Sequence, residues 1–307
     1  MKKVIISIST LALMGALVMI LTQSSCAAQS EQNQDVTTLV RVPELPESLE
    51  FAGERVPLEN YDTRESLIRE ILVTQNMHSR TSITLLLTSR YFPIIEPILE
   101  ENNIPLDFKY LCMAESGLDA NIASSAGAAG LWQLMPAVGR ENGMVVGSGV
   151  DERYNIEMAT RAACRHLQDS YDKFGNWTLA AAAYNLGPTG VKRRMDKQMM
   201  DNYYDMFLPS ETLRYVFRIL SMKLLYENPE QYGYQIPKDE YYKFHENYKI
   251  VTTDAQYIDW SKFAIDNGTT YKMLRELNHW IRDYDYTNNA RKKFDVKVPT
   301  ENFREVE

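Results

Sequence analysis

Residues 114–136 read AESGLDANIASSAGAAGLWQLMP, and the fold depends on how this stretch is interpreted. A glutamate, Glu115, ends an apolar helical pattern and stands directly before a loop of small residues and a Trp-Gln-Leu-Met-Pro run. Two interpretations are open for such a glutamate. It is either a solvated helix end before a flexible connector, or a carboxyl placed in an apolar surface for chemistry.

The pattern around Glu115 predicts a helix over residues 106–118. One face of that helix carries, at spacings of three and four, the side chains of Phe108, Leu111, Glu115 and Leu118. Glu115 therefore belongs to an apolar stripe, where the loss of hydration disfavours the carboxylate and raises its pKa. A carboxyl that is protonated near neutral pH is what a general acid requires.

The loop after this helix offers polar groups and close backbone approach. Ser124 and Ser125 supply hydroxyls, and the small residues 127–130 let a ligand come near the main chain. Further on, Gln133 carries an amide between bulky apolar neighbours. Each feature alone is typical of a plain loop or of core packing, but their combination indicates a binding site.

The same residues resemble the catalytic signature of lytic transglycosylases of the goose-lysozyme-like (SLT) group. That signature has Glu-Ser, a serine nine residues after the glutamate, and then GAxGL[MW]QxMP, which residues 127–136 match. Two further blocks follow in family order: AYNLGP at 183–188 resembles AYNxGP, and ETLRYV at 211–216 resembles ETRxYV. The resemblance covers about residues 85–233 and implies a mainly α, lysozyme-like catalytic domain. Trp132, the VGREN sequence and the tail point to a membrane-bound branch of the group.

The resemblance implies that the protein cleaves peptidoglycan between N-acetylmuramic acid and N-acetylglucosamine without water. Glu115 would protonate the glycosidic oxygen and then, as a carboxylate, take the proton from the muramic C6 hydroxyl that attacks the anomeric carbon. Glycosidases commonly use two carboxylates, but the sequence offers no clear second one, and we interpret Asp119 as a surface or capping residue. A hydrolytic muramidase with the same acid, or a non-catalytic glycan-binding protein, are the alternatives.

The family motif assigns supporting roles near the acid to three positions in the loop. Ser124 matches the motif serine and would hydrogen-bond near the acid or the bound sugar. Gln133 and Met135 would line the sugar subsite, and the Gln133 amide would bond acetamido groups of the glycan.

The later blocks supply further candidates. Tyr184 would position the acid and contact the sugar, with Asn185 beside it. Glu211 would orient this network from behind, and it also suits the N-terminus of a helix, where the dipole favours an acid. Tyr203 and Tyr204 are candidates for stacking on sugar rings, although tyrosines more often pack in a core.

The first 28 residues have the layout of a bacterial export signal, with two lysines, an apolar run over 4–21 and then small residues. The run is about long enough to span a bilayer, so a retained anchor is the structural alternative. Cleavage near residue 27 or 28 and lipidation at Cys26 are the other two fates, and we slightly favour lipidation. We expect an exported, periplasmic protein that Cys26 would anchor to the outer membrane.

Polarity and three prolines predict a linker over residues 29–60, followed by a helical domain over 61–240. Within that domain we expect separate helices on either side of Pro93. The tail over 245–302 predicts strand, helix, helix and strand, and it resembles LysM modules, which bind glycans containing N-acetylglucosamine. The usual Gly-Asp-Thr after the first strand is replaced by TTDAQYIDW, so glycan binding and a structural role are both open.

Composition narrows the set of partners. The 307 residues carry a formal net charge of −8 and no block of basic residues, which argues against a nucleic-acid partner. Cys112 and Cys164 lie in apolar helical patterns typical of core thiols, and a disulfide between them is the alternative in an oxidising compartment. No Cys/His cluster indicates a metal. The resemblance implies peptidoglycan strands as the partner, and the proton-shuttle chemistry that it implies needs neither a metal nor an organic cofactor.

Overall fold

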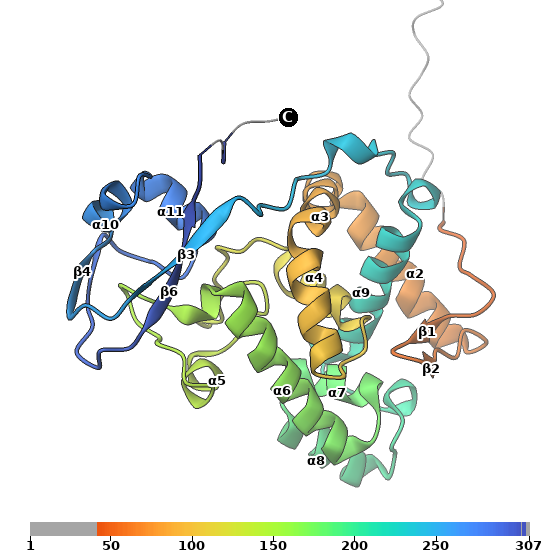
Figure 1. Ribbon diagram of the computed structural model, residues 1–307. Coiled ribbons are helices and arrows are strands. Elements are labelled where there is room, and N and C mark those ends of the chain that lie inside the picture. The colour runs from red at the N-terminus through yellow and green to blue at the C-terminus, as the bar shows by residue number, and fades with distance from the viewer. Residues whose placement is uncertain (1–41, 302, 305–307) are drawn as a thin grey trace, which may run out of the picture. The chain divides into compact units, whose positions relative to one another are not determined.

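Helices dominate residues 42–227, and a smaller unit of strands and short helices follows (Figure 1). The computed structural model describes residues 42–301, 303 and 304. The first part consists, in order, of β1 (Glu50–Phe51), β2 (Glu54–Arg55), α2 (Tyr61–Asn76), α3 (His78–Glu101), α4 (Phe108–Ser116), α5 (Pro136–Glu141), α6 (Ile156–Phe174), α7 (Trp177–Leu186), α8 (Pro188–Gln198) and α9 (Ser210–Glu227). The second part consists of β3 (Tyr248–Thr253), β4 (Tyr257–Asp259), α10 (Trp260–Asp266), α11 (Tyr271–Leu277), β5 (Asp285–Thr287) and β6 (Phe294–Pro299). Short 3-10 helices are η1 (Glu152–Tyr154), η2 (Tyr203–Asp205), η3 (Pro229–Tyr232) and η4 (Lys238–Glu240).

The predicted class, a mainly α domain followed by a strand–helix–helix–strand module, is confirmed. The expected export signal and Cys26 lie outside the described residues, as does the first part of the expected linker. Within the part of the chain that the structure describes, none of the helices is both long enough and apolar enough to cross a membrane.

The folded part begins before residue 61, where the sequence pattern placed its start. β1 and β2 pair antiparallel, and the side chains of Leu49, Phe51 and Val56 beside them are buried in the main core. The ring of Phe51 packs edge-on against Phe108 of α4, with 5.3 Å between the centroids. The prolines and charges around this hairpin are typical of a linker. The local sequence does not show that the hairpin is buried, because its partner, α4, is distant in the sequence.

α3 is one continuous helix, although the sequence predicted two helices separated around Pro93. Pro93 and Pro97 both lie inside it. A proline inside a helix removes one backbone hydrogen bond and crowds the preceding turn. The buried side chains of Phe92, Ile95 and Leu99 hold the helix in place, and this packing outweighs the local cost of the two prolines.

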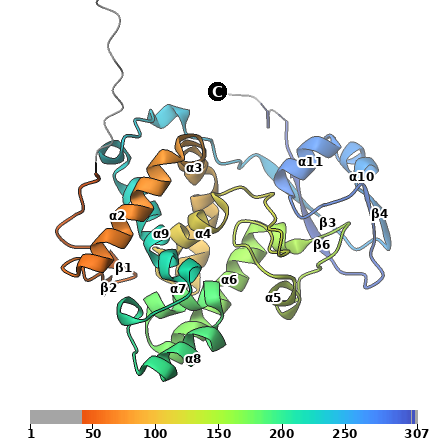
Figure 2. The ribbon, with the colours of Figure 1, turned by 180° about the vertical axis from the view of Figure 1, so that it is seen from behind.

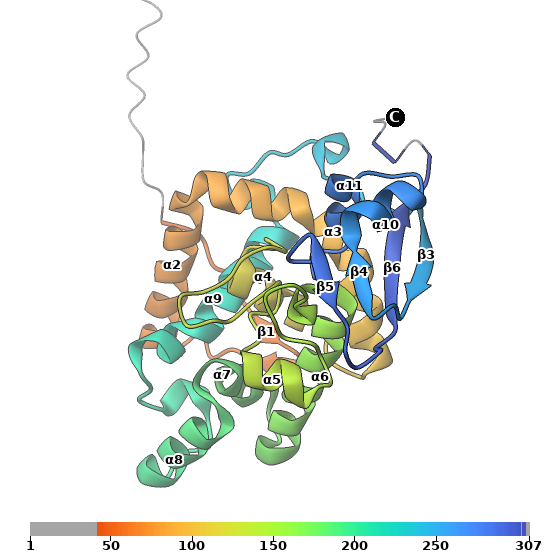
Figure 3. The ribbon, with the colours of Figure 1, turned by 90° about the vertical axis from the view of Figure 1, so that its left-hand side faces the viewer.

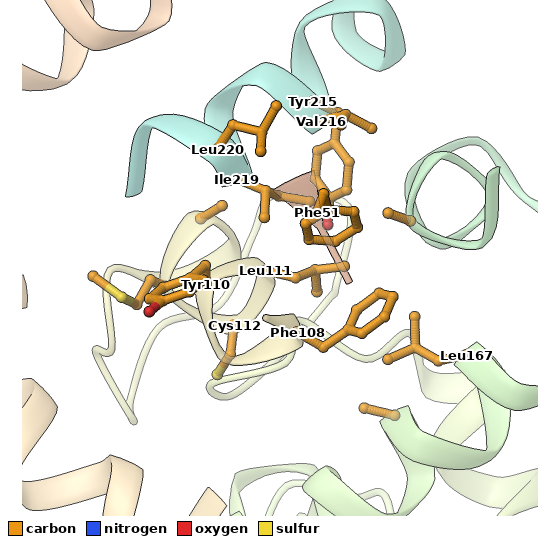
Figure 4. Close-up of a cluster of buried hydrophobic side chains, with 14 of the residues drawn as sticks. Phe51, Phe108, Tyr110, Leu111, Cys112, Leu167, Tyr215, Val216, Ile219 and Leu220 are labelled. Carbon is orange, nitrogen blue, oxygen red and sulfur yellow. The ribbon is translucent and has the colours of Figure 1, made fainter. Parts of the chain in front are cut away.

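α4 lies in the main core and packs against α3 and α9 (Figures 1 and 2). Figure 4 shows the buried side chains that gather around it: Phe51, Phe108, Leu111, Tyr215, Val216, Ile219 and Leu220. Some of these side chains come from an element that precedes α4 in the sequence, and others come from α9, which follows it. A side chain at the end of α4 is therefore placed by the core and not by a free helix end.

The helix predicted over 106–118 is observed as α4, and its C-terminal end is set by a glycine. Gly117 adopts the left-handed conformation with φ +62°, and its N–H donates to the carbonyl of Met113 at 2.8 Å. A residue with a Cβ is strained in that conformation. Glu115 consequently lies in the last turn of α4, directly before the loop that carries the small residues.

The C-terminal module has the predicted order of elements. β3 and β6 pair antiparallel over six residues each, from Tyr248 opposite Pro299 to Thr253 opposite Phe294, and Figure 3 shows them side by side. The alternation predicted for β6 is confirmed because Phe294, Val296 and Val298 are buried while Asp295 between them is exposed. The structure adds a second antiparallel pair, β4 with β5, that the sequence pattern did not predict.

Replacing the buried ring of the first hairpin tests whether this segment belongs to the domain. We expect Phe51→Ala to lower the free energy of unfolding by about 3–5 kcal/mol, because it removes a fully buried aromatic side chain from the core. Tyr61→Ala is the control, since that ring is 77% exposed and its loss should change stability by less than about 0.5 kcal/mol. Urea denaturation of both variants measures the difference, and equal stabilities would mean that the hairpin is a linker after all.

Candidate active site

Glu115 is half-buried at the end of α4, among apolar side chains. Burial raises the pKa of Glu115 from 4.5 to about 7. The carboxyl is therefore partly protonated at neutral pH, as the apolar stripe in the sequence predicted. A group with this pKa can donate a proton and take one back in the same reaction.

Tyr215 of α9 holds the carboxyl of Glu115 directly. Its hydroxyl donates a hydrogen bond to Glu115 Oε1, and the tyrosine itself is buried. This bond stabilises the carboxylate, so it lowers the pKa of Glu115 and opposes the larger effect of burial. Burial and the neighbouring Glu115 carboxyl raise the pKa of the Tyr215 hydroxyl well above its usual value, so Tyr215 remains a donor.

No role was predicted for Tyr215, although it lies in the ETLRYV block at 211–216. A signal was present. Tyr215 shares a stripe with Val216, Ile219 and Leu220, and a tyrosine in a buried stripe usually needs a partner for its hydroxyl. The identity of that partner depends on how α9 packs on α4, which no local pattern contains.

Two further charges act on the carboxyl from a distance. The guanidinium of Arg218 lowers the pKa of Glu115, and the carboxylate of Glu211 raises it. These two residues pair with each other, with 2.8 Å between Arg218 Nη1 and Glu211 Oε1, and the Glu211 side chain is 59% exposed. Glu211 also lies in the first turn of α9, as its sequence position suggested. Glu211 therefore acts on Glu115 through its charge, and the neighbouring charge of Arg218 acts in the opposite direction.

The loop after α4 is folded back on itself by its own small polar groups. Ser124 Oγ accepts from the N–H of Ala128 at 3.0 Å, and the Ser124 N–H donates to the carbonyl of Ala128 at 2.9 Å. Ser124 therefore closes a tight exposed turn. The motif serine shapes the loop, and its side chain makes no hydrogen bond to Glu115.

Gln133 and Met135 lie at the far end of the loop. The Gln133 side-chain amide donates to the carbonyl of Gly130 at 2.9 Å and to that of Ile122 at 3.4 Å, so its N–H groups hold the loop together. Its side-chain carbonyl oxygen is then the atom suited to accept from the N–H of a ligand. Met135 is 44% exposed directly before α5, where it offers an apolar surface to a ligand.

Tyr184 and Asn185 of α7 connect the loop and α9 to the region around the acid. The Tyr184 hydroxyl donates to the carbonyl of Trp132 at 2.7 Å, and Asn185 Oδ1 accepts from Thr212 Oγ1 at 2.8 Å. Burial raises the pKa of the Tyr184 hydroxyl well above its usual value, and the nearby Glu115 carboxyl raises it further. We expected Tyr184 to position the acid, but the side chain that bonds Glu115 is Tyr215, and Tyr184 holds the loop instead.

The structure also bears on the predictions for Tyr203, Tyr204 and Asp119. Tyr203 is buried and its hydroxyl donates to the carbonyls of Thr212 and Leu213, so of the two alternatives left open for this residue, core packing is the one observed. Tyr204 packs its ring against Tyr203 in the same cluster, with 5.3 Å between the centroids. Asp119 is exposed and accepts from the N–H of Asn121 at 2.9 Å, which agrees with a capping role.

The cysteines belong to the core. Cys112 and Cys164 are both buried free thiols, and the Cys112 thiol donates to the carbonyl of Leu131 in the loop. Among the described residues, no group of three or more His, Cys, Asp or Glu side chains is placed to hold a metal ion.

Two family models match this chain. Residues 93–207 match the family model of the transglycosylase SLT domain, and residues 249–302 match that of the soluble lytic transglycosylase C-terminal LysM-like domain. The chain therefore contains an SLT transglycosylase domain and a LysM-like C-terminal domain. It is homologous to membrane-bound lytic murein transglycosylase D of Escherichia coli strain K12, with 31% identity over 144 residues, which are 45% of this chain and 32% of that protein. This chain thus spans about a third of the length of that relative.

Two solved structures are also similar to this chain. One is an inactive mutant of the lytic transglycosylase Slt from Pseudomonas aeruginosa, with 20% identity and a TM-score of 0.38 over 60% of this chain and 31% of that one. The other is the 70 kDa soluble lytic transglycosylase of Escherichia coli, with 18% identity and a TM-score of 0.41 over 64% of this chain and 34% of that one.

The raised pKa of Glu115 makes stability depend on pH. The folded protein holds the Glu115 proton more tightly than the unfolded chain, so this contribution is complete below about pH 4.5 and is lost as the pH rises through about 7. Relative to Glu115→Gln, which cannot ionise, we expect the wild type to lose about 3 kcal/mol between about pH 4 and about pH 8. Urea denaturation of both proteins across that range measures the loss. A difference that does not vary with pH would show that Glu115 ionises at its ordinary pKa.

Proposed function

We propose that this protein is a peptidoglycan lytic transglycosylase. It cleaves the β-1,4 bond between N-acetylmuramic acid and N-acetylglucosamine and leaves a 1,6-anhydromuramic end. The observation that carries the proposal is the half-buried Glu115, with a pKa of about 7 and a hydrogen bond from Tyr215, beside the loop that matches the family signature. The relative from Escherichia coli, a murein transglycosylase, supports the same substrate class.

Glu115 carries the proton in both directions. In the first step its carboxyl protonates the glycosidic oxygen, and the bond from the anomeric carbon to that oxygen breaks. In the second step the Glu115 carboxylate takes the proton of the muramic C6 hydroxyl, and the C6 oxygen bonds to the anomeric carbon. The proton lost in the first step is thus regained in the second, and no water is consumed. Between the steps, the Tyr215 hydroxyl stabilises the carboxylate through its hydrogen bond.

The residues around the acid bind and orient the glycan. Ser124 shapes the exposed turn near which the sugar lies, and Gln133 offers its side-chain carbonyl oxygen to an acetamido N–H. Met135 supplies apolar contact. Tyr184 and Asn185 fix the wall of the subsite by holding the loop and α9.

A hydrolytic muramidase is the second candidate. Such an enzyme would use Glu115 as the acid and activate water, usually with a second carboxylate. Among the described residues, Glu211 is the one other carboxylate whose charge acts on Glu115, and it is paired with Arg218. That pairing favours the transglycosylase. The third candidate, a non-catalytic glycan-binding protein, has no need of a carboxyl with this pKa.

We also propose a place in the cell envelope. Peptidoglycan strands are the substrate, and the relative in Escherichia coli is described as membrane-bound. From the sequence, we propose that residues 1–28 are an export signal, that Cys26 is lipidated, and that the lipid anchors the protein to the outer membrane. Growth with labelled palmitate tests it. Label that is incorporated by the wild type and lost in Cys26→Ala would support the anchor, and equal labelling of the two would contradict it.

The decisive test of the activity is the structure of the released product. We expect the mature protein to release 1,6-anhydromuramic muropeptides from purified peptidoglycan, and Glu115→Gln to reduce this release by about a thousandfold or more, because the proton shuttle is lost. Mass spectrometry of the products measures both. Glu101→Gln is the matched control, since that glutamate forms an exposed ion pair with Arg161 and its loss should leave the rate unchanged. Products with reducing ends would make the enzyme a hydrolase.

The hydrogen bond from Tyr215 predicts a change in the pH profile. The alkaline limb of kcat/KM should fall near pH 7, where Glu115 loses its proton in the free enzyme. Tyr215→Phe removes a group that stabilises the carboxylate, so the limb should move to higher pH and kcat should fall by about tenfold. Tyr203→Phe is the matched control, because it also removes a buried, hydrogen-bonded hydroxyl, but one that bonds carbonyls of α9. The same shift in both variants would contradict the role given to Tyr215.

A further inference from the structure

The LysM-like module shares a hydrophobic core with the catalytic domain. Its buried side chains cluster with three residues that belong to the domain: Ala129, Val150 and Tyr154. Ala129 lies in the loop after α4, and the other two lie in the segment that leads to α6. Figure 3 shows β5 of the module beside this part of the chain. The module is therefore built onto the domain and is not connected to it by the linker alone.

Backbone hydrogen bonds join the two parts along one edge. The N–H of Asp151 donates to the carbonyl of Trp280, and the N–H of Arg282 donates to the carbonyl of Gly149, both at 2.9 Å. Val150 and Ile281 form the β-bridge between these two bonds. The backbone of residues 149–151 is thus paired with that of the module.

Charged pairs cross the same boundary. Lys292 of the module forms an ion pair with Glu152, whose side chain is only 5% exposed, and Lys292 also donates to the carbonyl of Gly143 at 3.0 Å. Lys297 of β6 pairs with Glu157 at the start of α6. A buried carboxylate such as Glu152 needs its partner, so the module and this segment depend on each other.

Arg153 carries the connection from this segment to the active-site loop. Its guanidinium is almost fully buried and forms a two-bond pair with Asp151, at 2.7 and 3.0 Å. The remaining nitrogen, Nη1, donates to the carbonyl of Gly127 at 2.6 Å and to that of Leu134 at 2.9 Å. Arg153 therefore joins the two ends of the loop segment that includes Gln133.

The loop is also packed tightly against the main chain of Arg153. A Cβ placed on Gly130 would lie 2.3 Å from the carbonyl oxygen of Arg153, so only glycine allows this approach. On its other side the loop accepts hydrogen bonds from Cys112 of α4 and Tyr184 of α7. The contacts thus run without interruption from the module to the helices beside Glu115.

We propose that Arg153 is a positioning residue for the loop over 127–134, and that the LysM-like module braces the active site by holding the segment that carries Arg153. The loop is the wall that presents Gln133 and Met135 to the glycan. The catalytic part of this proposal rests on the proposed function, whereas the structural part does not. The departure of TTDAQYIDW from the usual LysM sequence is consistent with a module that is kept for this support.

The test uses a variant that keeps the charge of Arg153. In Arg153→Lys the ammonium can still pair with Asp151, but it cannot also reach both loop carbonyls as the guanidinium fork does. We expect kcat on purified peptidoglycan to fall by about 100-fold with little change in KM, because a loop displaced by about 1 Å misplaces the substrate. Arg161→Lys, the same substitution in an exposed ion pair, is the control. Unchanged kcat, or a raised KM with unchanged kcat, would overturn the proposal.

Hydrogen exchange on the full mature chain reads the loop without any assay of activity. We expect the amides of residues 124–135 to lose protection in Arg153→Lys and in Lys292→Met, while those of α4 and α9 keep theirs. Lys262→Met is the control for the second variant, because Lys262 pairs with Asp266 on the exposed face of α10. Unchanged loop protection in both variants would overturn the brace. Since this readout needs no turnover, it still decides the matter if the chain proves not to be a transglycosylase.

Discussion

Keeping the Glu115 carboxyl away from water costs free energy, and the elements around α4 are arranged to offset that cost. The carboxyl lies in the last turn of α4, where burial raises its pKa to about 7. Ionisation there is tolerated because the Tyr215 hydroxyl donates to it and the guanidinium of Arg218 lies nearby. Burial and these donors act in opposite directions, and their balance produces a group that exchanges its proton near neutral pH.

That balance requires α4 and α9 to be held at a defined separation. The aromatic and aliphatic side chains between them, with the ring of Phe51 inserted from the N-terminal hairpin, form the tightly packed part of the core (Figure 4). Interiors of this density resist displacement, so the hydroxyl of Tyr215 is presented to Glu115 at a nearly fixed position. The hairpin thus contributes to the active site although it lies more than fifty residues before Glu115 in the sequence.

The other wall of the proposed sugar subsite is the backbone of the loop after α4. The loop after α4 is closed by Ser124 and Gln133 and tied to α7 by Tyr184. Its other side is held by Arg153, in a segment that pairs with the LysM-like module. A loop of small residues has little side-chain packing of its own, so its order comes from hydrogen bonds to elements around it. This explains why catalytic domain and module share a core.

Features that follow from local periodicity can be read directly from the order of the residues. The apolar stripe that includes Glu115 and the alternation in β6 are written into a few neighbouring residues and were predicted, whereas the helix predicted to residue 118 ends at Gly117. Tertiary structure alone decided which group bonds Glu115, why Tyr203 is buried, why the hairpin of Phe51 is folded and why α3 continues through its prolines. In each of these, the deciding contact is with a residue far along the chain, and the free energy of that contact exceeds the local preference.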